Sequence, residues 1–127
     1  MKAGEISLRL SSGPDAVSAA RRSLDPLEAH IGAERLRDVR LLVSELVTNS
    51  IRHARRGEGD QVELAVTVRH DRIHVCVSDH GPGFRARPRH PGEDSPGGWG
   101  LFLVEKLSDR WGVDLNGRTQ VWFELAR

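Results

Sequence analysis

Two polar side chains lie four residues apart inside an apolar run, at Glu45 and Asn49. On a helix this spacing places both on one face. Asn is a weak helix former, and a buried amide needs partners. Its carboxamide oxygen would suit Mg²⁺, and a carboxylate one turn away could orient a nucleophile and take its proton. The alternative is that the pair forms the solvated edge of a helix.

A second candidate is Asp79, which ends an apolar strand-like segment and precedes Gly81 and Gly83. A carboxylate in a pocket could accept a hydrogen bond from an exocyclic amine such as that of adenine. Glycines at these positions would let a flat base lie against the backbone. The alternative is a turn in which the aspartate side chain caps its own backbone.

The third candidate is a glycine cluster, Gly97-Gly98-Trp99-Gly100-Leu101, which opens an apolar segment with helical spacing. Glycines before a helix let backbone N–H groups approach an anion, and the helix N-terminus adds a favourable dipole. An ordinary turn before a helix is the alternative. The cluster is not a Walker A loop, because no Gly-Lys-Ser/Thr follows. It is not a dinucleotide-binding fingerprint either, because the required strand and the downstream acidic residue are missing.

The composition is that of one ordinary globular domain, spanning residues 1–127. A net charge of +1 provides no global field for nucleic acid or membranes, so we expect no direct contact with either. The single cysteine, Cys76, excludes an internal disulfide and fits a reducing cytoplasm. We find neither a signal-peptide pattern nor an apolar run long enough to cross a membrane.

Hydrophobic periodicity predicts the elements that must position the three candidates. Residues 80–98 contain five glycines and four prolines and cannot be regular structure, so we expect a functional loop there. The predicted order gives an α/β fold, a two-layer sandwich with a mixed, mostly antiparallel sheet and helices on one face. We expect strands at 5–10, 62–68, 73–79, 112–115 and 118–126. We expect helices at 33–54 and 99–110, and an earlier helix after Pro14 that Pro26 interrupts with a kink or a break near Asp25.

Taken together and in this order, the motifs resemble those of the GHKL ATP-binding superfamily, which has the Bergerat fold. Glu45-x-x-x-Asn49 is similar to its N box, and Asp79-x-Gly81-x-Gly83 is similar to its G1 box. Gly98-x-Gly100-Leu101 is similar to its G2 box, so that residues 84–97 would form the ATP lid. Gly117-x-Thr119 resembles the terminal element whose hydroxyl helps to hold adenine through water.

Within the superfamily the chain most resembles the small anti-sigma-factor serine/threonine kinases, the partner-switching regulators of bacteria. Residues 43–49, followed by Arg52-His53-Ala54, are typical of them. The resemblance implies an ATP-dependent kinase that phosphorylates an anti-sigma-factor antagonist and sequesters a sigma factor. A non-catalytic ATP-binding module that sequesters a sigma factor or another partner is the alternative. Family members commonly dimerise, and the helix near residues 14–30 is a candidate surface by analogy.

The resemblance also implies roles for individual residues. Asn49 would ligate Mg²⁺, Glu45 would be the general base, and Asp79 would bind the adenine amine. Arg52 or His53 would contact phosphate, although solvated surface side chains are the alternative. The remaining nucleotide-binding residues would be Gly81, Gly83, Gly98, Gly100, Leu101 and Thr119.

Overall fold

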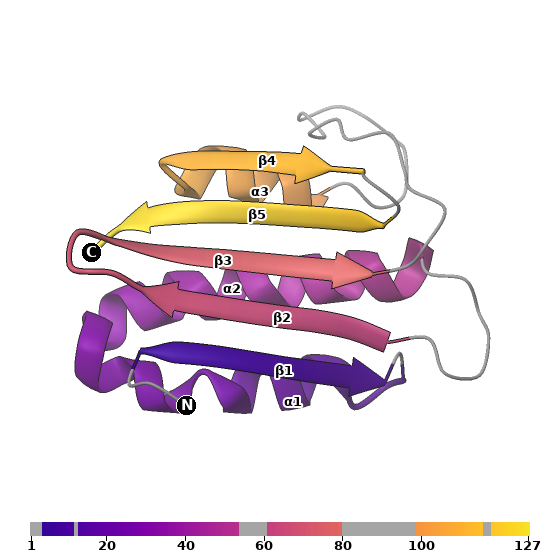
Figure 1. Ribbon diagram of the computed structural model, residues 1–127, viewed down its shortest axis with the longest axis horizontal. Helices are drawn as coiled ribbons and strands as arrows, with labels where there is room; N and C mark the ends of the chain where they lie inside the picture. The colour runs from indigo at the N-terminus through magenta and orange to yellow at the C-terminus, as the bar shows by residue number, and fades with distance from the viewer. Residues whose placement is uncertain (1–3, 12, 54–60, 80–98, 116–117) are drawn as a thin grey trace.

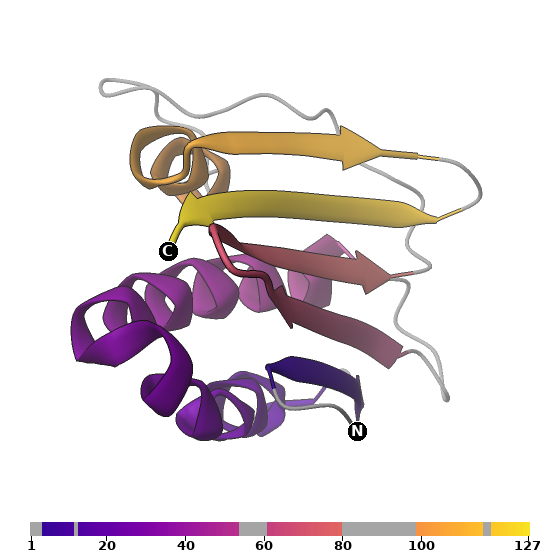
Figure 2. The same cartoon turned by 60° about the vertical axis from the view of Figure 1, so that its left-hand side comes forward.

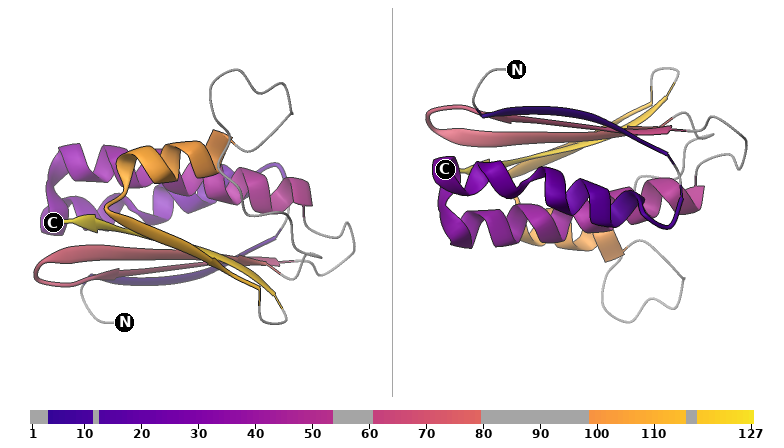
Figure 3. Two further views of the ribbon diagram at one scale, coloured as in Figure 1. Left: turned by 90° about the horizontal axis from the view of Figure 1, so that it is seen from above. Right: turned by 90° about the horizontal axis from the view of Figure 1, so that it is seen from below.

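The computed structural model describes residues 4–11, 13–53, 61–79, 99–115 and 118–127. It has two layers, a five-stranded sheet and a set of helices packed on one of its faces (Figures 1 and 3). The other face of the sheet carries none of the described helices (Figure 3). The predicted two-layer α/β sandwich is thus confirmed.

The sheet has the strand order β1-β2-β3-β5-β4, and the four pairings between its neighbouring strands are antiparallel. β3 and β5 are therefore neighbours at the centre of the sheet although a helix and a strand separate them in the sequence. The strands are β1 (Glu5–Ser11), β2 (Gln61–Val68), β3 (Arg72–Asp79), β4 (Arg110–Asp114) and β5 (Thr119–Ala126).

The helical layer contains α1 (Ala16–Ser23), the short 3₁₀ helix η1 (Asp25–Leu27), α2 (Glu28–His53) and α3 (Trp99–Leu107). Of the predicted kink or break near Asp25, the structure shows a break, because α1 stops at Ser23 and a 3₁₀ turn containing Pro26 follows. An ion pair between Arg40 and Asp25 ties this turn to α2. Figure 2 shows α2 as the longest helix, running beneath the centre of the sheet.

α2 contains one non-helical residue, Gly32, with φ 83° and ψ 165°. These angles are accessible essentially only to glycine, because a Cβ atom would collide with the adjoining peptide. The chain changes direction there, and the regular part of α2 begins after it. This agrees with the predicted start of the second helix at residue 33.

Alternation along the strands builds the core between the two layers. On β5, Val121, Phe123 and Leu125 are buried against the helices, while the residues between them face the opposite side. The apolar stripe of α2 meets this face. Its fully or almost fully buried members are Leu36, Val39, Leu42, Val43, Leu46 and Val47.

α3 ends three residues earlier than predicted, at Leu107, and β4 begins earlier, at Arg110. The physical reason is local hydrogen bonding. The amide and the hydroxyl of Ser108 both donate to the carbonyl of Val104, which closes the helix. The amide of Asp109 already donates to the carbonyl of Glu124, which starts the next ladder.

The predicted loop at residues 80–98, including the lid at 84–97, and the turn at Asn116-Gly117 lie outside the described residues. None of the described helices is both long and apolar enough to span a membrane.

The backbone conformation at Gly32 gives a stability prediction. We expect Gly32→Ala to lower the free energy of unfolding by about 1–3 kcal/mol, because alanine is strained at this φ and ψ. Gly13→Ala is the matched control, since a Cβ at either position meets nothing within 4 Å and only Gly32 has a positive φ. Urea denaturation of both variants measures the difference, and equal midpoints would contradict the explanation.

Candidate functional site

A buried polar pair closes one end of the β3–β5 ladder. Asp79, the last residue of β3, is the direct cross-strand partner of Thr119, the first residue of β5. They are only 3% and 2% exposed, respectively. Both lie on the sheet face that carries Val77 and Val121, so they are directed toward the helical layer.

The hydroxyl of Thr119 is buried, and it has no hydrogen-bond partner within the described part of the chain. Buried polar groups are nearly always paired with protein, water or a ligand, so an unmet hydroxyl needs an explanation. A bound molecule that offers a hydrogen bond beside a buried carboxylate would provide one. Among the residues that the structure describes, the Asp79–Thr119 pair is therefore the strongest indication of a ligand site.

The C-terminal half of α2 supplies a second polar wall. Asn49 is 7% exposed, which confirms that the mid-helix amide is buried. Glu45, one turn earlier, is half-buried at the margin of the apolar stripe. Leu46 and Val47 lie between them in sequence and are anchored in the core, so they fix the rotation of the helix that presents the two polar side chains.

These elements converge at one end of the molecule. In Figures 1 and 3 the last turns of α2, the end of β3, the start of β5 and the start of α3 all lie toward the same end. α2 packs directly against both β3 and α3. The fold thus brings the described parts of the predicted motifs to a common region, although tens of residues separate them in the sequence. These parts lie on the last turns of α2, at the end of β3 and at the starts of α3 and β5.

Other predicted residues are placed only in part or not at all. Arg52 and His53 lie in the last turn of α2, and Gly100 and Leu101 lie in the first turn of α3. For these four the structure describes the backbone elements alone. The remaining three glycines, Gly81, Gly83 and Gly98, lie outside the described residues.

The donor set fits a weakly held magnesium ion better than a protein-only metal cage. Within the described ranges, no group of three or more His, Cys, Asp or Glu side chains could hold a metal. Mg²⁺ commonly takes one or two protein oxygens and completes its shell with substrate phosphates and water. One buried amide oxygen on Asn49 suits that arrangement.

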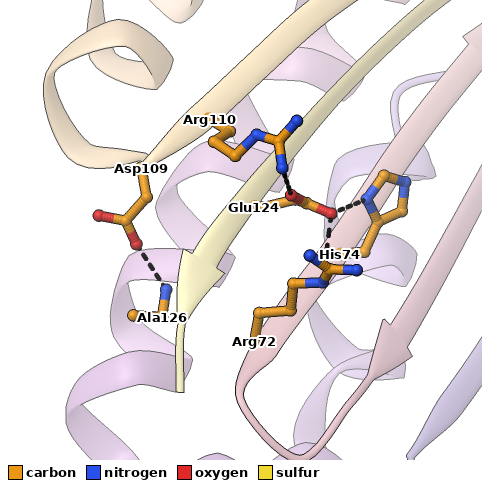
Figure 4. Close-up of polar contacts among 6 residues, drawn as sticks. All are labelled: Arg72, His74, Asp109, Arg110, Glu124 and Ala126. Atoms are coloured by element: carbon orange, nitrogen blue, oxygen red, sulfur yellow. Dashed lines mark hydrogen bonds and ion pairs between the residues drawn. The ribbon is translucent and has the colours of Figure 1, made fainter.

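The outer face of the sheet has polar networks that the sequence analysis missed. Glu124 of β5 is 12% exposed and is surrounded by Arg72, His74 and Arg110 (Figure 4). The His74 Nδ1 atom lies 3.0 Å from Glu124 Oε2, and the His74 ring stacks on Trp122 at 5.6 Å between centroids. The alternation of polar and apolar residues along each strand predicts which side chains share the outer face. It does not predict which residues of neighbouring strands lie opposite one another.

Cys76 also lies on the outer face, and its thiol is 3.7 Å from the Ser78 hydroxyl. Burial raises the pKa of the Cys76 thiol above its ordinary value. A thiol with a raised pKa is mostly protonated at neutral pH and reacts slowly. Cys76 therefore acts as a small, unreactive side chain in the packing of this face.

A model of the histidine kinase-like ATPase domain matches residues 10–125. This is nearly the whole chain, so the protein belongs to the histidine kinase-like ATPase domain family. The resemblance to GHKL ATP-binding proteins is thereby confirmed.

Among its relatives are bacterial proteins named serine-protein kinase RsbW. The chain is 36% identical over 119 residues to the one from Listeria monocytogenes, an alignment that covers 83% of this chain and 76% of that protein. It is 30% identical over 136 residues to the one from Oceanobacillus iheyensis, which covers 96% and 85%. The relative from Staphylococcus epidermidis is 34% identical over 119 residues, with 82% and 75% covered.

A solved structure supports the fold. The histidine kinase domain of the blue-light activated histidine kinase from Erythrobacter litoralis EL346 matches with a TM-score of 0.57 and 24% identity. The match covers 86% of this chain and 64% of that one. At this identity the likeness shows a shared architecture.

The unmet hydroxyl of Thr119 leads to a prediction for the nucleotide-free protein. Thr119→Val keeps the shape of the side chain and removes the buried hydroxyl, so we expect it to raise the free energy of unfolding by about 1 kcal/mol. Thr119→Ser, which keeps the hydroxyl, should give no such gain. Chemical denaturation of both variants is the measurement, and a less stable valine variant would show that the hydroxyl has a partner.

Proposed function

We propose that this protein is an ATP-dependent serine/threonine protein kinase of the anti-sigma-factor type. Its substrate would be a serine of an anti-sigma-factor antagonist, and it would also sequester a sigma factor. The observation that carries the proposal is the buried Asp79–Thr119 pair at the α2 end of the sheet, in a chain related to serine-protein kinases. The protein would act in the cytoplasm, and by analogy with the family it could form a homodimer.

The adenine end of the site rests on Asp79 and Thr119. A carboxylate can accept a hydrogen bond from the exocyclic amine of adenine, and the neighbouring hydroxyl would contact the ring through a water molecule. Because both groups are almost fully buried, each such hydrogen bond would be made away from competing solvent. Gly81 and Gly83 would leave room for the flat base beside this pair.

The phosphate end rests on α2 and the start of α3. Asn49 would hold Mg²⁺. When bound, this ion would neutralise negative charge on the phosphates during phosphoryl transfer. Gly98, Gly100 and Leu101 would wrap the phosphates, with Arg52 and His53 close to them. The backbone N–H groups at the start of α3 carry the positive end of the helix dipole, which favours anions.

Glu45 would act as the general base. It is half-buried on the helix that carries Asn49, so its carboxylate remains accessible to an incoming hydroxyl group while its position is fixed by the core. The carboxylate would orient the serine hydroxyl of the antagonist and take its proton as the oxygen attacks the γ-phosphorus of ATP, while the bond from that phosphorus to ADP breaks and ADP leaves. Phosphoryl transfer depends mainly on such positioning and on charge neutralisation.

The adenine assignment is tested by Asp79→Asn. We expect this variant to bind ATP at least about tenfold more weakly, because an amide replaces a charged acceptor in a buried site. Asp71→Asn, at an exposed position in the turn at the far end of β3, is the matched control and should bind normally. Isothermal titration calorimetry with Mg²⁺-ATP gives both affinities. An unchanged affinity for the first variant would refute the assignment.

The role of Glu45 is tested by Glu45→Gln. We expect normal ATP binding and a loss of transfer of about 10²–10⁴-fold, the usual contribution of a general base. Glu34→Gln, an exposed change on the same helix, is the control. Transfer of ³²P from labelled ATP to the purified antagonist is the measurement. A wild type that binds ATP and phosphorylates no antagonist would instead be the non-catalytic binding module.

A further inference from the structure

A row of polar residues crosses the outer face of the sheet directly behind the Asp79–Thr119 pair. The strand register places one member on each strand, each paired with the next across the sheet. From one edge of the sheet to the other they are Arg9, Glu63, Ser78, Gln120 and Asp114. Ser78 and Gln120 are the immediate chain neighbours of Asp79 and Thr119, so the row and the buried pair share two peptide bonds.

Arg118 lies across this row. It precedes Thr119 in the chain, and its Nη1 atom lies 3.3 Å from Glu63 Oε2, on a strand two positions away. The Gln120 amide oxygen, in the orientation that satisfies both amide atoms, accepts from Arg118 Nε and Nη2 at 3.3 and 2.8 Å. The Arg118 guanidinium therefore contacts both Gln120, which follows Thr119 on β5, and Glu63 on β2.

The anchor of this bridge is itself held. Arg9 Nε lies 3.5 Å from the second oxygen of Glu63, so each carboxylate oxygen has its own arginine. In the same orientation the Gln120 amide oxygen lies 3.4 Å from the hydroxyl of Ser78, on the strand between, and this hydroxyl can donate to it. Together with Cys76 these side chains line a shallow hollow of about 220 Å³ on the outer face. The bridge thus links β2, β3 and β5 at the end of the sheet where the buried pair lies.

We propose that Arg118 is a positioning residue for nucleotide binding, which acts through its bridge to Glu63 and Gln120 to hold Thr119 opposite Asp79. The inference rests on the proposed function. Thr119 is the first residue of its strand, and the ends of ladders open more readily than their centres. No described helix packs on the outer face behind it, so side-chain bonds there must restrain the strand end. A small displacement of a positioning group weakens the contacts that depend on it.

The first part of the test needs no nucleotide. Amide hydrogen exchange in the nucleotide-free protein should become faster at Thr119 and Gln120 in Arg118→Ala, and equally so in Glu63→Gln. The double variant should be no worse than Arg118→Ala alone, because both changes break the same bridge. Arg110→Ala, which removes an outer-face arginine that contacts Glu124 elsewhere, is the control and should leave these two amides unchanged.

The second part measures nucleotide binding. We expect Arg118→Ala to raise the ATP dissociation constant about threefold to fivefold, in line with the modest strength of partly exposed ion pairs. The KM for ATP should rise and kcat should stay constant, since Arg118 touches no reacting group. Arg118→Lys should recover part of the affinity. Arg9→Ala removes the other arginine from Glu63 and should have a smaller effect, because Arg9 is far from Thr119 in the sheet.

The outcomes separate the two proposals. Faster exchange with unchanged ATP affinity would show that the bridge is structural and would overturn the positioning role. Unchanged exchange would overturn the bridge itself. A wild type that binds no ATP would refute the proposed function, and with it the nucleotide role of Arg118. The hydrogen-exchange result would still test whether the bridge restrains the strand end, because that measurement needs no nucleotide. Equal effects of Arg9→Ala and Arg118→Ala on ATP affinity would point to local charge in place of positioning.

Discussion

The antiparallel register between β3 and β5 is the constraint on which the rest of the site depends. It joins two segments separated by a helix and a strand in the sequence, and it makes Asp79 and Thr119 direct neighbours. A shift of one residue would turn each side chain of one strand to the opposite face. Val121 and Phe123 would then face solvent, so burial of the core and assembly of the polar pair are secured by the same interaction.

The described helices cover only one face of the sheet, so the two faces are stabilised in different ways. The inner face combines the apolar core with a buried polar end, where low exposure strengthens each polar contact. The outer face compensates for the missing layer with charged and aromatic networks around Glu63, Glu124 and Trp122. The Trp122 indole lies so close over Gly112 that a Cβ there would come within 2.7 Å of it, which explains a glycine in the middle of a strand.

The elements of this fold were readable from the sequence because periodicity determines them, and the break at Pro26 followed from the chemistry of proline. The end of α3 was not predictable in this way, since it depends on the bonds from Ser108 to Val104, and these need the helix to be in place. The candidate site residues were proposed from their spacing and from the family resemblance. Two features could not be predicted, because both depend on strand register. One is that the Thr119 hydroxyl has no hydrogen-bond partner among the described residues, and the other is the contact between Arg118 and Glu63.

The buried hydroxyl of Thr119 also has an evolutionary consequence. A lineage selected for folding alone would gain from valine or isoleucine at position 119, since both suit a strand and leave no polar atom unmet. Retention of threonine or serine there across related sequences would therefore record selection for ligand binding. Replacement by an aliphatic residue would mark descendants that had given up the nucleotide while keeping the fold. If Thr119 contacts the nucleotide as proposed, position 119 would offer a sequence criterion for separating nucleotide-binding members of the family from members that no longer bind it.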